Sequence, residues 1–161
     1  MNSADIDQKS AGSANIEEGS AELIITARSV VYPWHCDHMG HMNVMWYVGK
    51  FDEATWQLLA SIGLSGPRLR REGIGMVAVE QHIEYKRELH AGDLLTVRSS
   101  LEEIREKSLR FVHEMTNQVS EELAARTVLT AVCIDTTTRK AKPLPADIRE
   151  RVSKMRPPQA K

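Results

Sequence analysis

Cysteine and net charge are both scarce in this chain of 161 residues. Cys36 and Cys133 are its two cysteines, far fewer than in the disulfide frameworks of small secreted proteins, so we expect both thiols to be reduced. With 21 basic and 22 acidic residues the formal net charge is -1, and such a chain has no overall field that would attract nucleic acid. Nine glycines and six prolines are too few for a collagenous or low-complexity chain.

Long hydrophobic runs are also missing. The longest apolar stretch, 128–134, is far shorter than the roughly 20 residues that a membrane-spanning helix needs. The first twenty residues lack both the basic leader and the apolar block of a secretion signal. These absences predict a cytoplasmic protein with no membrane partner.

The pattern of residue types divides the chain into three parts. Residues 1–20 are rich in Ser, Ala, Asn and acidic residues without periodicity, which is typical of a disordered tail. We expect one folded domain over 21–140, because 42% of the chain is hydrophobic and its length suits a single core. Residues 141–161 form a C-terminal extension, with a short predicted helix at 146–154 and a polar end.

A long amphipathic helix is predicted after a first strand. β-branched residues over 23–32 favour a strand that stops at Pro33. Over 44–62, apolar residues recur every three and four positions, which is one stripe of a helix. Asn43 suits the N-cap of this helix, and Gly63 suits the position just past its end.

Four more strands follow a turn-rich connection at 67–75. Apolar and polar residues alternate along the first three, and the last is almost entirely apolar, as expected for a central strand covered on both faces. The predicted strands span 77–85, 95–101, 109–115 and 127–134. This order predicts an α+β fold in which a five-stranded antiparallel sheet, its last four strands in a meander, packs against one long helix.

Side chains that could carry chemistry concentrate in the loop before that helix. Residues 34–43 contain three histidines, a thiol, a carboxylate and an amide. Because free N–H groups and the dipole at a helix N-terminus favour negative charge, Asp37 could act there on a carbonyl whose oxygen those groups polarise. Two other interpretations stay open. The His38-x-x-His41 spacing suits a metal, although no distant Cys or His pair completes a known signature, or these side chains could simply cap the helix and satisfy the loop backbone.

The segment Asp37-x-x-Gly40-His41-x-Asn43 resembles the helix start of the 4-hydroxybenzoyl-CoA thioesterase-like family, whose members have the hotdog fold. Further similar segments are Phe51-Asp52-Glu53-Ala54, Leu89-His90-Ala91-Gly92-Asp93 and Lys107-Ser108-Leu109-Arg110-Phe111. The resemblance covers about residues 23–138. It implies a sheet wrapped around one long helix, in agreement with the element order above.

The resemblance implies an acyl-CoA thioesterase that requires no cofactor. Asp37 would attack the thioester carbonyl or deprotonate a water that does. Backbone N–H groups around Asn43 and Val44 would polarise the carbonyl, and His41 and Asn43 would orient the loop or a water. A thioester suits one carboxylate, because its carbonyl is weakly stabilised by resonance and its thiol, with a pKa of roughly 8.5, leaves readily.

Coenzyme A would also require basic residues for its phosphates. The candidates are Arg87, Lys107, Ser108 and Arg110, with Arg68, Arg70 and Arg71 behind them. The resemblance implies an active site between two subunits, so a homodimer is the minimum and a homotetramer is common in the family. Residues that would line an acyl pocket are Trp34, Met39, Met42, Met45 and Trp46. Of these, Trp34 and Trp46 would suit a cationic acyl group.

Two other functions stay open. One is a non-catalytic acyl-CoA-binding or sensor module, in which Asp37 takes no part in chemistry. The other is a hotdog hydratase or dehydratase, although the Pro-rich His loop usual for dehydration is missing. Glu53 and Glu80 are further carboxylates that could face a cleft, but such residues are more often exposed or interface charges. The sequence does not identify the acyl group.

Overall fold

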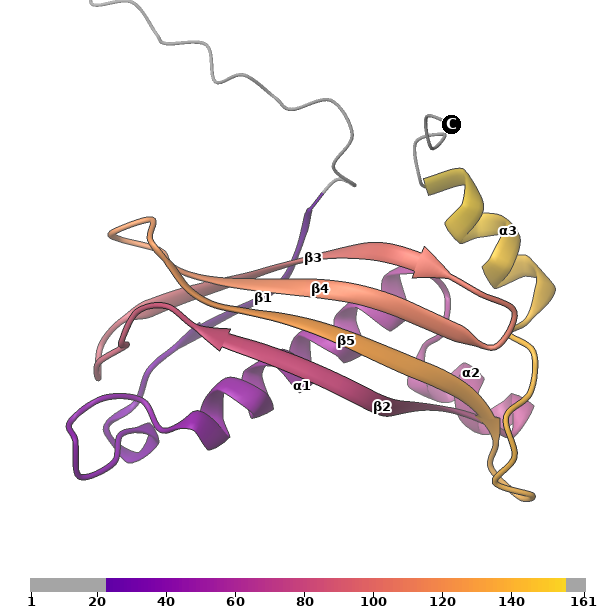
Figure 1. Ribbon diagram of the computed structural model, residues 1–161, viewed down its shortest axis with the longest axis horizontal. Coiled ribbons are helices and arrows are strands. Elements are labelled where there is room, and N and C mark those ends of the chain that lie inside the picture. Colours follow the sequence, from indigo (N-terminus) through magenta and orange to yellow (C-terminus); the bar gives the residue numbers. More distant parts are fainter. Residues whose placement is uncertain (1–22, 156–161) are drawn as a thin grey trace, which may run out of the picture.

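The computed structural model describes residues 23–155, so the predicted tail at 1–20 lies outside the described residues. Strands and helices follow one another along the chain in the order expected for an α+β protein (Figure 1). The elements are β1 (Ile24–Val30), η1 (Pro33–His35), α1 (Val44–Ser61), α2 (Gly66–Glu72), β2 (Ile74–Tyr85), β3 (Leu94–Ile104), β4 (Ser108–Asn117), β5 (Leu123–Asp135) and α3 (Ala146–Met155).

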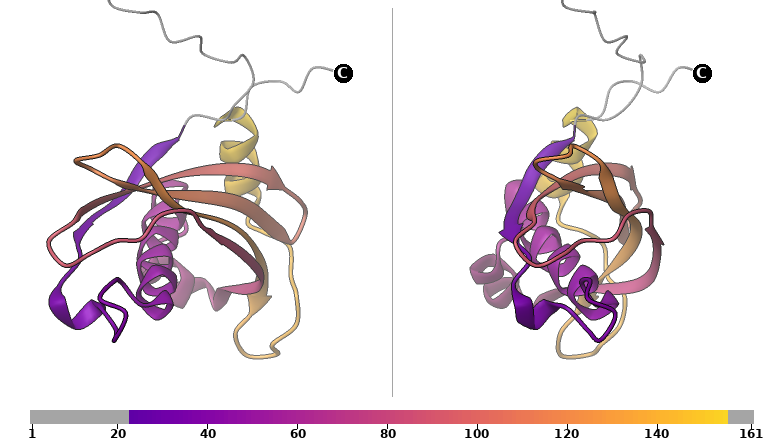
Figure 2. Two further views of the ribbon diagram at one scale, coloured as in Figure 1. Left: turned by 60° about the vertical axis from the view of Figure 1, so that its left-hand side comes forward. Right: turned by 90° about the vertical axis from the view of Figure 1, so that its left-hand side faces the viewer.

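The five strands form one antiparallel sheet in the order β1-β3-β4-β5-β2. The sheet curves around α1, as the two turned views show (Figure 2). The predicted hotdog architecture of a five-stranded sheet around one long helix is therefore confirmed.

The predicted four-stranded meander is wrong. Only β3, β4 and β5 are sequential neighbours, whereas β2 pairs with β5 at the far edge of the sheet. Alternation of apolar and polar residues shows which face of a strand is buried, but it does not identify the neighbouring strand. That choice depends on pairing between residues as distant as Ile74 and Asp135.

The connection predicted at 67–75 contains a short helix, α2. Pro67 lies in its first turn, where a missing N–H costs nothing, and Gly73 ends it in the left-handed conformation with a φ of 60°. Glycine and proline therefore bracket a helix here rather than a simple turn. Leu69 on α2 is buried in the core.

The prediction that the last strand is covered on both faces is also wrong for this chain. Along β5, residues buried in the core alternate with half-exposed ones. The half-exposed side chains between positions 126 and 132 are Arg126, Val128, Thr130 and Val132. The strand is interior within the sheet, yet within residues 23–155 its outer face is left half-exposed.

The core consists of two hydrophobic clusters with a polar layer between them. One includes Leu58 and Phe111, and the other includes Phe51 and Met115. His113 lies between them on β4 and is fully buried. Its ring nitrogens bond to Thr55 of α1 and Ser99 of β3, and the Ser99 hydroxyl bonds to Thr26 of β1. The polar layer thus connects the helix to three strands.

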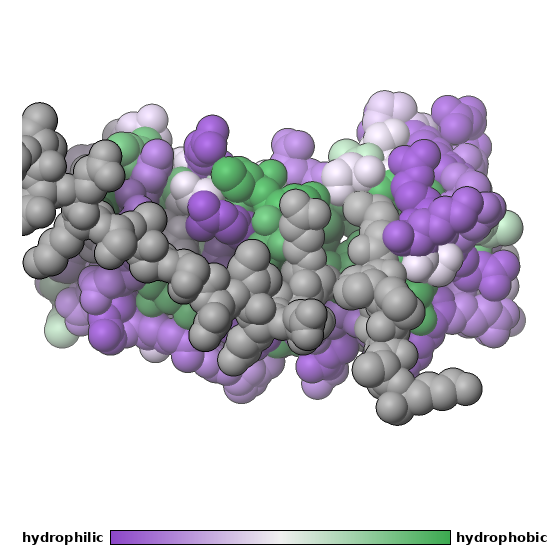
Figure 3. Space-filling model, turned by 90° about the horizontal axis from the view of Figure 1, so that it is seen from above, coloured by the Kyte–Doolittle hydropathy of each residue, from purple (hydrophilic) through white to green (hydrophobic). Residues whose placement is uncertain are grey.

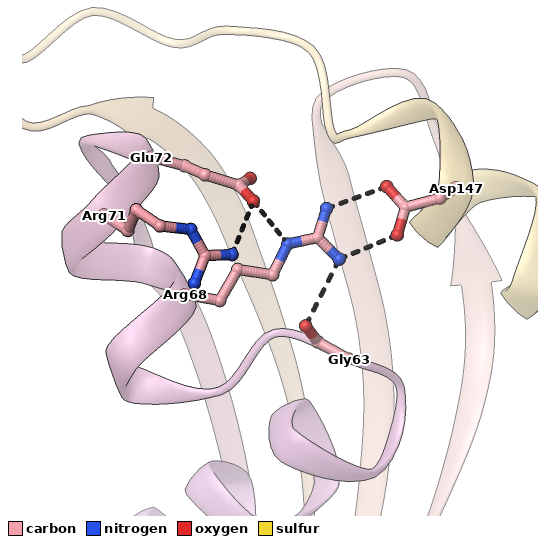
Figure 4. A network of polar contacts seen from close by, with 5 residues as sticks. All are labelled: Gly63, Arg68, Arg71, Glu72 and Asp147. Atoms are coloured by element: carbon pink, nitrogen blue, oxygen red, sulfur yellow. Dashed lines mark hydrogen bonds and ion pairs between the residues drawn. The ribbon is translucent and has the colours of Figure 1, made fainter.

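The C-terminal helix predicted at 146–154 is confirmed as α3. Its residues Ile148 and Val152 are buried in the first hydrophobic cluster. Arg68 of α2 holds α3 in place, because its guanidinium donates two hydrogen bonds to Asp147, of 2.7 and 2.8 Å, and one of 2.8 Å to Glu72 (Figure 4). We expected Arg68 to lie behind a phosphate site, but its guanidinium is paired with the carboxylates of Asp147 and Glu72.

Most exposed large hydrophobic side chains lie at sheet edges and in the segment around the start of α1. Seen from above, hydrophobic side chains gather near the middle of the molecule, and hydrophilic ones border them (Figure 3). Among residues 23–155, no helix is long and apolar enough to cross a membrane.

Candidate active site

Residues 36–42 form a narrow loop between η1 and α1. The Asn43 N–H donates to the His35 carbonyl at 2.9 Å, and the Asp37 N–H donates to the His41 carbonyl at 3.2 Å. Cys36 and Met42 pair between these two bonds. Gly40 turns the tip of the loop with a φ of 82°, a conformation that strains other residues. The backbone itself therefore keeps the two ends of this loop together.

Asp37 lies in this loop with both carboxylate oxygens hydrogen-bonded. Oδ2 accepts from the Asn43 side-chain amide at 2.9 Å, and Oδ1 accepts from the Met39 N–H at 2.9 Å. The Asn43 bond, followed by the Met39 bond, holds the pKa of Asp37 below its ordinary value. Asp37 is therefore an ionised, oriented carboxylate at neutral pH.

Asn43 connects this carboxylate to the helix. It is the N-cap of α1, as predicted, and its Oδ1 accepts from the Met45 N–H at 3.0 Å. One side chain thus satisfies the helix end with its oxygen and orients Asp37 with its nitrogen. The expected capping role of this loop is confirmed, and it coexists with the placement of the carboxylate.

The backbone N–H groups around the helix start differ in availability. The Asn43 N–H is bonded to His35, and the Met45 N–H is bonded to the Asn43 side chain. Within residues 23–155, the Val44 N–H has no hydrogen-bond partner, and Val44 is exposed. Two N–H groups were expected to polarise a carbonyl. The N–H of Val44 is therefore available for this role, whereas the N–H of Asn43 is already hydrogen-bonded.

His41 contacts the loop after β2. Its Nε2 lies 3.7 Å from Glu88 Oε1. The site loop contacts this same segment through the Met42 N–H, which bonds to the Leu89 carbonyl at 2.7 Å. The Tyr47 hydroxyl bonds to the Arg87 carbonyl, and burial raises the pKa of Tyr47 to about 12. Residues 87–89 therefore contact both the loop that carries Asp37 and α1.

The four candidate CoA-binding residues do not gather in one chain. Arg87 lies at the Asp37 end of the sheet and forms an ion pair with Glu122. Ser108 begins β4 at the opposite end, directly after Lys107, since Tyr85 pairs with Ala125 and Ser108 pairs with Val132. Ala125 and Val132 are seven residues apart on β5, so at roughly 3.3 Å per residue the two ends are about 23 Å apart. The fourth candidate, Arg110, forms an ion pair with Glu102.

The remaining candidates are not assembled into a second reactive centre. No group of three or more potential metal ligands lies together within residues 23–155, so the metal interpretation of the His38-x-x-His41 spacing is not supported there. Glu53 and Glu80 are exposed. Arg70 and Arg71 lie in the last turn of α2.

Two tryptophans flank the site, and both contact His35. The ring centroid of Trp46 lies 4.2 Å from that of His35, and that of Trp34 lies 5.9 Å from it. Trp34 is 66% exposed and stacks on Tyr32. The two rings expected to bind a cationic acyl group therefore both pack on the same buried histidine.

Sequence reasoning missed the burial of His35 and Lys50. His35 was counted with the loop but given no role, and it is buried. Lys50 is buried on α1, where its Nζ donates to Ser29 Oγ at 2.6 Å, and burial lowers its pKa. Its position three residues after Tyr47 and four before Ala54, both buried, is a signal that could have revealed it.

Comparisons with known proteins agree on one family. The model of the Thioesterase-like superfamily matches residues 31–152. The long-chain acyl-CoA thioesterase FadM of Escherichia coli is 31% identical over 122 residues, which are 76% of this chain and 92% of FadM. The betainyl-CoA thioesterase of Pseudomonas aeruginosa is 27% identical over 95 residues, or 59% of this chain and 60% of that protein.

Solved structures show the same similarity. The crystal structure of a 1,4-dihydroxy-2-naphthoyl-CoA thioesterase from Synechocystis superposes with a TM-score of 0.71 at 25% identity. The superposition covers 80% of this chain and 95% of that one.

Proposed function

The chain belongs to the thioesterase-like superfamily and is an acyl-CoA thioester hydrolase, and on this premise we propose that Asp37 is its catalytic carboxylate. One observation carries this proposal. Asp37 is held by Asn43 and by the Met39 N–H at the start of α1, close in sequence to the open Val44 N–H. A carboxylate and an oxyanion donor therefore belong to the same short segment.

The chemistry follows from these groups. The lowered pKa keeps Asp37 ionised, so it acts on the thioester carbonyl carbon directly or takes a proton from a water that attacks it. The Val44 N–H and the dipole of α1 stabilise the negative charge that develops on the carbonyl oxygen. The products are a carboxylic acid and free CoA. No step requires a further cofactor.

We further propose that the working enzyme is at least a homodimer formed through β2. This strand is a sheet edge of twelve residues, and its middle residues are exposed on both faces, with Val79 60% exposed. Unpaired edges of this length are normally covered. If two β2 strands pair antiparallel about a two-fold axis, Lys107 and Ser108 of the second copy approach the Asp37 loop of the first. The separated CoA candidates then come together across the interface.

Release of CoA thiol from a panel of acyl-CoAs tests the catalytic proposal. The panel includes long-chain acyl-CoAs and betainyl-CoA, because relatives are named for these substrates. We expect Asp37→Asn to lower kcat by about a hundredfold or more while CoA binding is retained, since the side chain keeps its size but loses its charge and one of its two acceptor oxygens. The matched control is Asp52→Asn, an exposed carboxylate on α1.

Each outcome of this assay has a clear meaning. Equal activity of the Asp37→Asn variant contradicts the catalytic role of Asp37. Binding of acyl-CoA without turnover by the wild-type protein favours the sensor module. The same assay with an added chelator tests whether turnover is independent of metal ions. The cytoplasmic location and the number of subunits stay predictions.

A further inference from the structure

His35 forms the base of the loop that carries Asp37. Its side chain is buried, with a relative exposure of 6%, although its neighbours Trp34 and His38 are exposed. It bonds to both sides of the loop. The His35 carbonyl accepts the Asn43 N–H at 2.9 Å, and its ring Nδ1 accepts the Tyr32 N–H at 3.1 Å.

We infer that His35 is a positioning residue for the thioesterase reaction, one that holds Asn43, and through it Asp37, by means of the hydrogen-bond acceptor at Nδ1. This inference rests on the proposed function of Asp37. His35 does not touch Asp37 itself. It acts through Asn43, whose side-chain nitrogen orients the carboxylate.

Two contacts connect His35 to the start of α1, and a third fixes its ring. The Asn43 N–H is bonded to its carbonyl, so the N-cap residue is tied to the His35 backbone. The His35 ring lies against Trp46 in the first turn of α1, at 4.2 Å between centroids. The Tyr32 N–H bond to Nδ1 sets the rotation of that ring. Without this bond the ring of His35 can rotate, and His35 then no longer holds Trp46 and Asn43 in fixed positions.

This arrangement requires a neutral imidazole. Nδ1 accepts a hydrogen bond, so it carries a lone pair, and any proton of the neutral ring is on Nε2. Burial lowers the pKa of His35, and the positive charge of Lys50 adds to this, while Glu53 opposes it. Lys50 and Glu53 both lie on α1, and the other rings packed on His35, those of Tyr32, Trp34 and Trp46, carry no charge. The environment therefore keeps His35 in its accepting form at neutral pH.

Three substitutions separate the ring acceptor from the ring itself. His35→Phe keeps a flat ring against Trp46 but has no acceptor. His35→Asn places an amide oxygen where Nδ1 was, so it retains the acceptor. His35→Gln places its amide one bond further out and loses the acceptor at Nδ1, so it replaces His35→Phe if that variant does not fold.

We expect His35→Phe and His35→Gln to lower kcat by about tenfold with KM changed less than about twofold, because Asp37 is misplaced while the substrate surface is intact. His35→Asn is expected to restore most of kcat. The kcat of His35→Asn is also expected to persist to lower pH than that of the wild type. In the wild type, protonation of His35 abolishes the acceptor at Nδ1, whereas the asparagine amide does not titrate. Equal kcat values in all three variants and the wild type overturn the inference, and so does an equal loss in His35→Phe and His35→Asn.

Amide hydrogen exchange gives a readout that does not depend on turnover. Exchange of the Tyr32 and Asn43 N–H groups should accelerate in His35→Phe or His35→Gln and stay near the wild-type rate in His35→Asn. If the wild-type protein hydrolyses no thioester, the proposed function fails, but the exchange rates still decide the role of His35. Unchanged exchange in the variants without the acceptor contradicts that role.

Discussion

The buried imidazole of His113 should make the stability of this protein sensitive to acid. His113 is fully buried between the two hydrophobic clusters, with Phe51 and Phe111 against its ring. Burial lowers the pKa of His113 to about 4, from an ordinary value of 6.5. Its neutral form accepts from the Ser99 hydroxyl at Nδ1 and donates to Thr55 at Nε2, and the Thr55 hydroxyl in turn donates to the Phe51 carbonyl.

The sign and size of the effect follow from proton uptake. As pH falls below 6.5 the unfolded chain takes up a proton at His113, while the folded chain stays neutral until about pH 4. The free energy of unfolding therefore decreases between these two values, by about 1.4 kcal/mol per pH unit and about 3 kcal/mol in all. Above pH 6.5 neither state is protonated at this residue, and its contribution is constant.

Urea unfolding at fixed protein concentration, between pH 7.5 and pH 4.5, measures this effect. The comparison is between the wild type and His113→Asn, which keeps an acceptor for Ser99 and does not titrate. We expect His113→Asn to be less stable at pH 7.5 because the core is less well filled, by about 1–3 kcal/mol, and its stability to fall less steeply with acid. Other acid-sensitive groups, such as Asp37 and His35, contribute equally to both proteins. Parallel curves for the two proteins would refute this reasoning.

Three further predictions concern the helix contacts, the loop tip and the sheet edge. Asp147→Asn should lower the thermal unfolding midpoint, because Arg68 loses a bidentate partner between α2 and α3, and added salt should reduce the difference from the wild type in differential scanning calorimetry. Gly40→Ala should lower the free energy of unfolding by about 1 kcal/mol, since the φ of Gly40 is 82°. Gly49→Ala within α1 should raise it by about 0.5–1 kcal/mol, because the added methyl group has open space. Chemical denaturation of the two variants distinguishes backbone strain from the effect of the methyl group. Val79→Lys on β2 should shift the protein toward monomer in sedimentation velocity, while Val119→Lys, at a still more exposed valine in a turn, should not. An unchanged mass for Val79→Lys would argue against pairing through β2.

Local sequence patterns predicted much of this molecule. The helix expected at 44–62 is observed at Val44–Ser61 with the N-cap at Asn43, because the repeat of apolar residues and the capping chemistry involve only neighbouring residues. Each predicted strand lies within an observed strand or matches it to within two residues, since alternation is also a local property. The loop with Asp37, Gly40 and Asn43 was identified for the same reason: the hydrogen bonds that close it and orient Asp37 join residues at most eight positions apart, and only its contacts with Glu88 and Leu89 are long-range.

Tertiary structure decided what depends on distant partners. The place of β2 beside β5, the occupation of Arg68 by Asp147, and the distance between Arg87 and Lys107 all depend on residues far apart in the sequence. The polar layer of Thr26, Ser99, His113 and Thr55 also has no local signal, because its members come from four elements. Burial of His35 and Lys50 follows from the same packing. By itself the sequence determined the elements, the family resemblance and the loop that carries Asp37, since these depend on short-range order. Which strands pair, which charges are occupied and which imidazoles are held neutral were decided by folding, which brings remote side chains together and removes them from water.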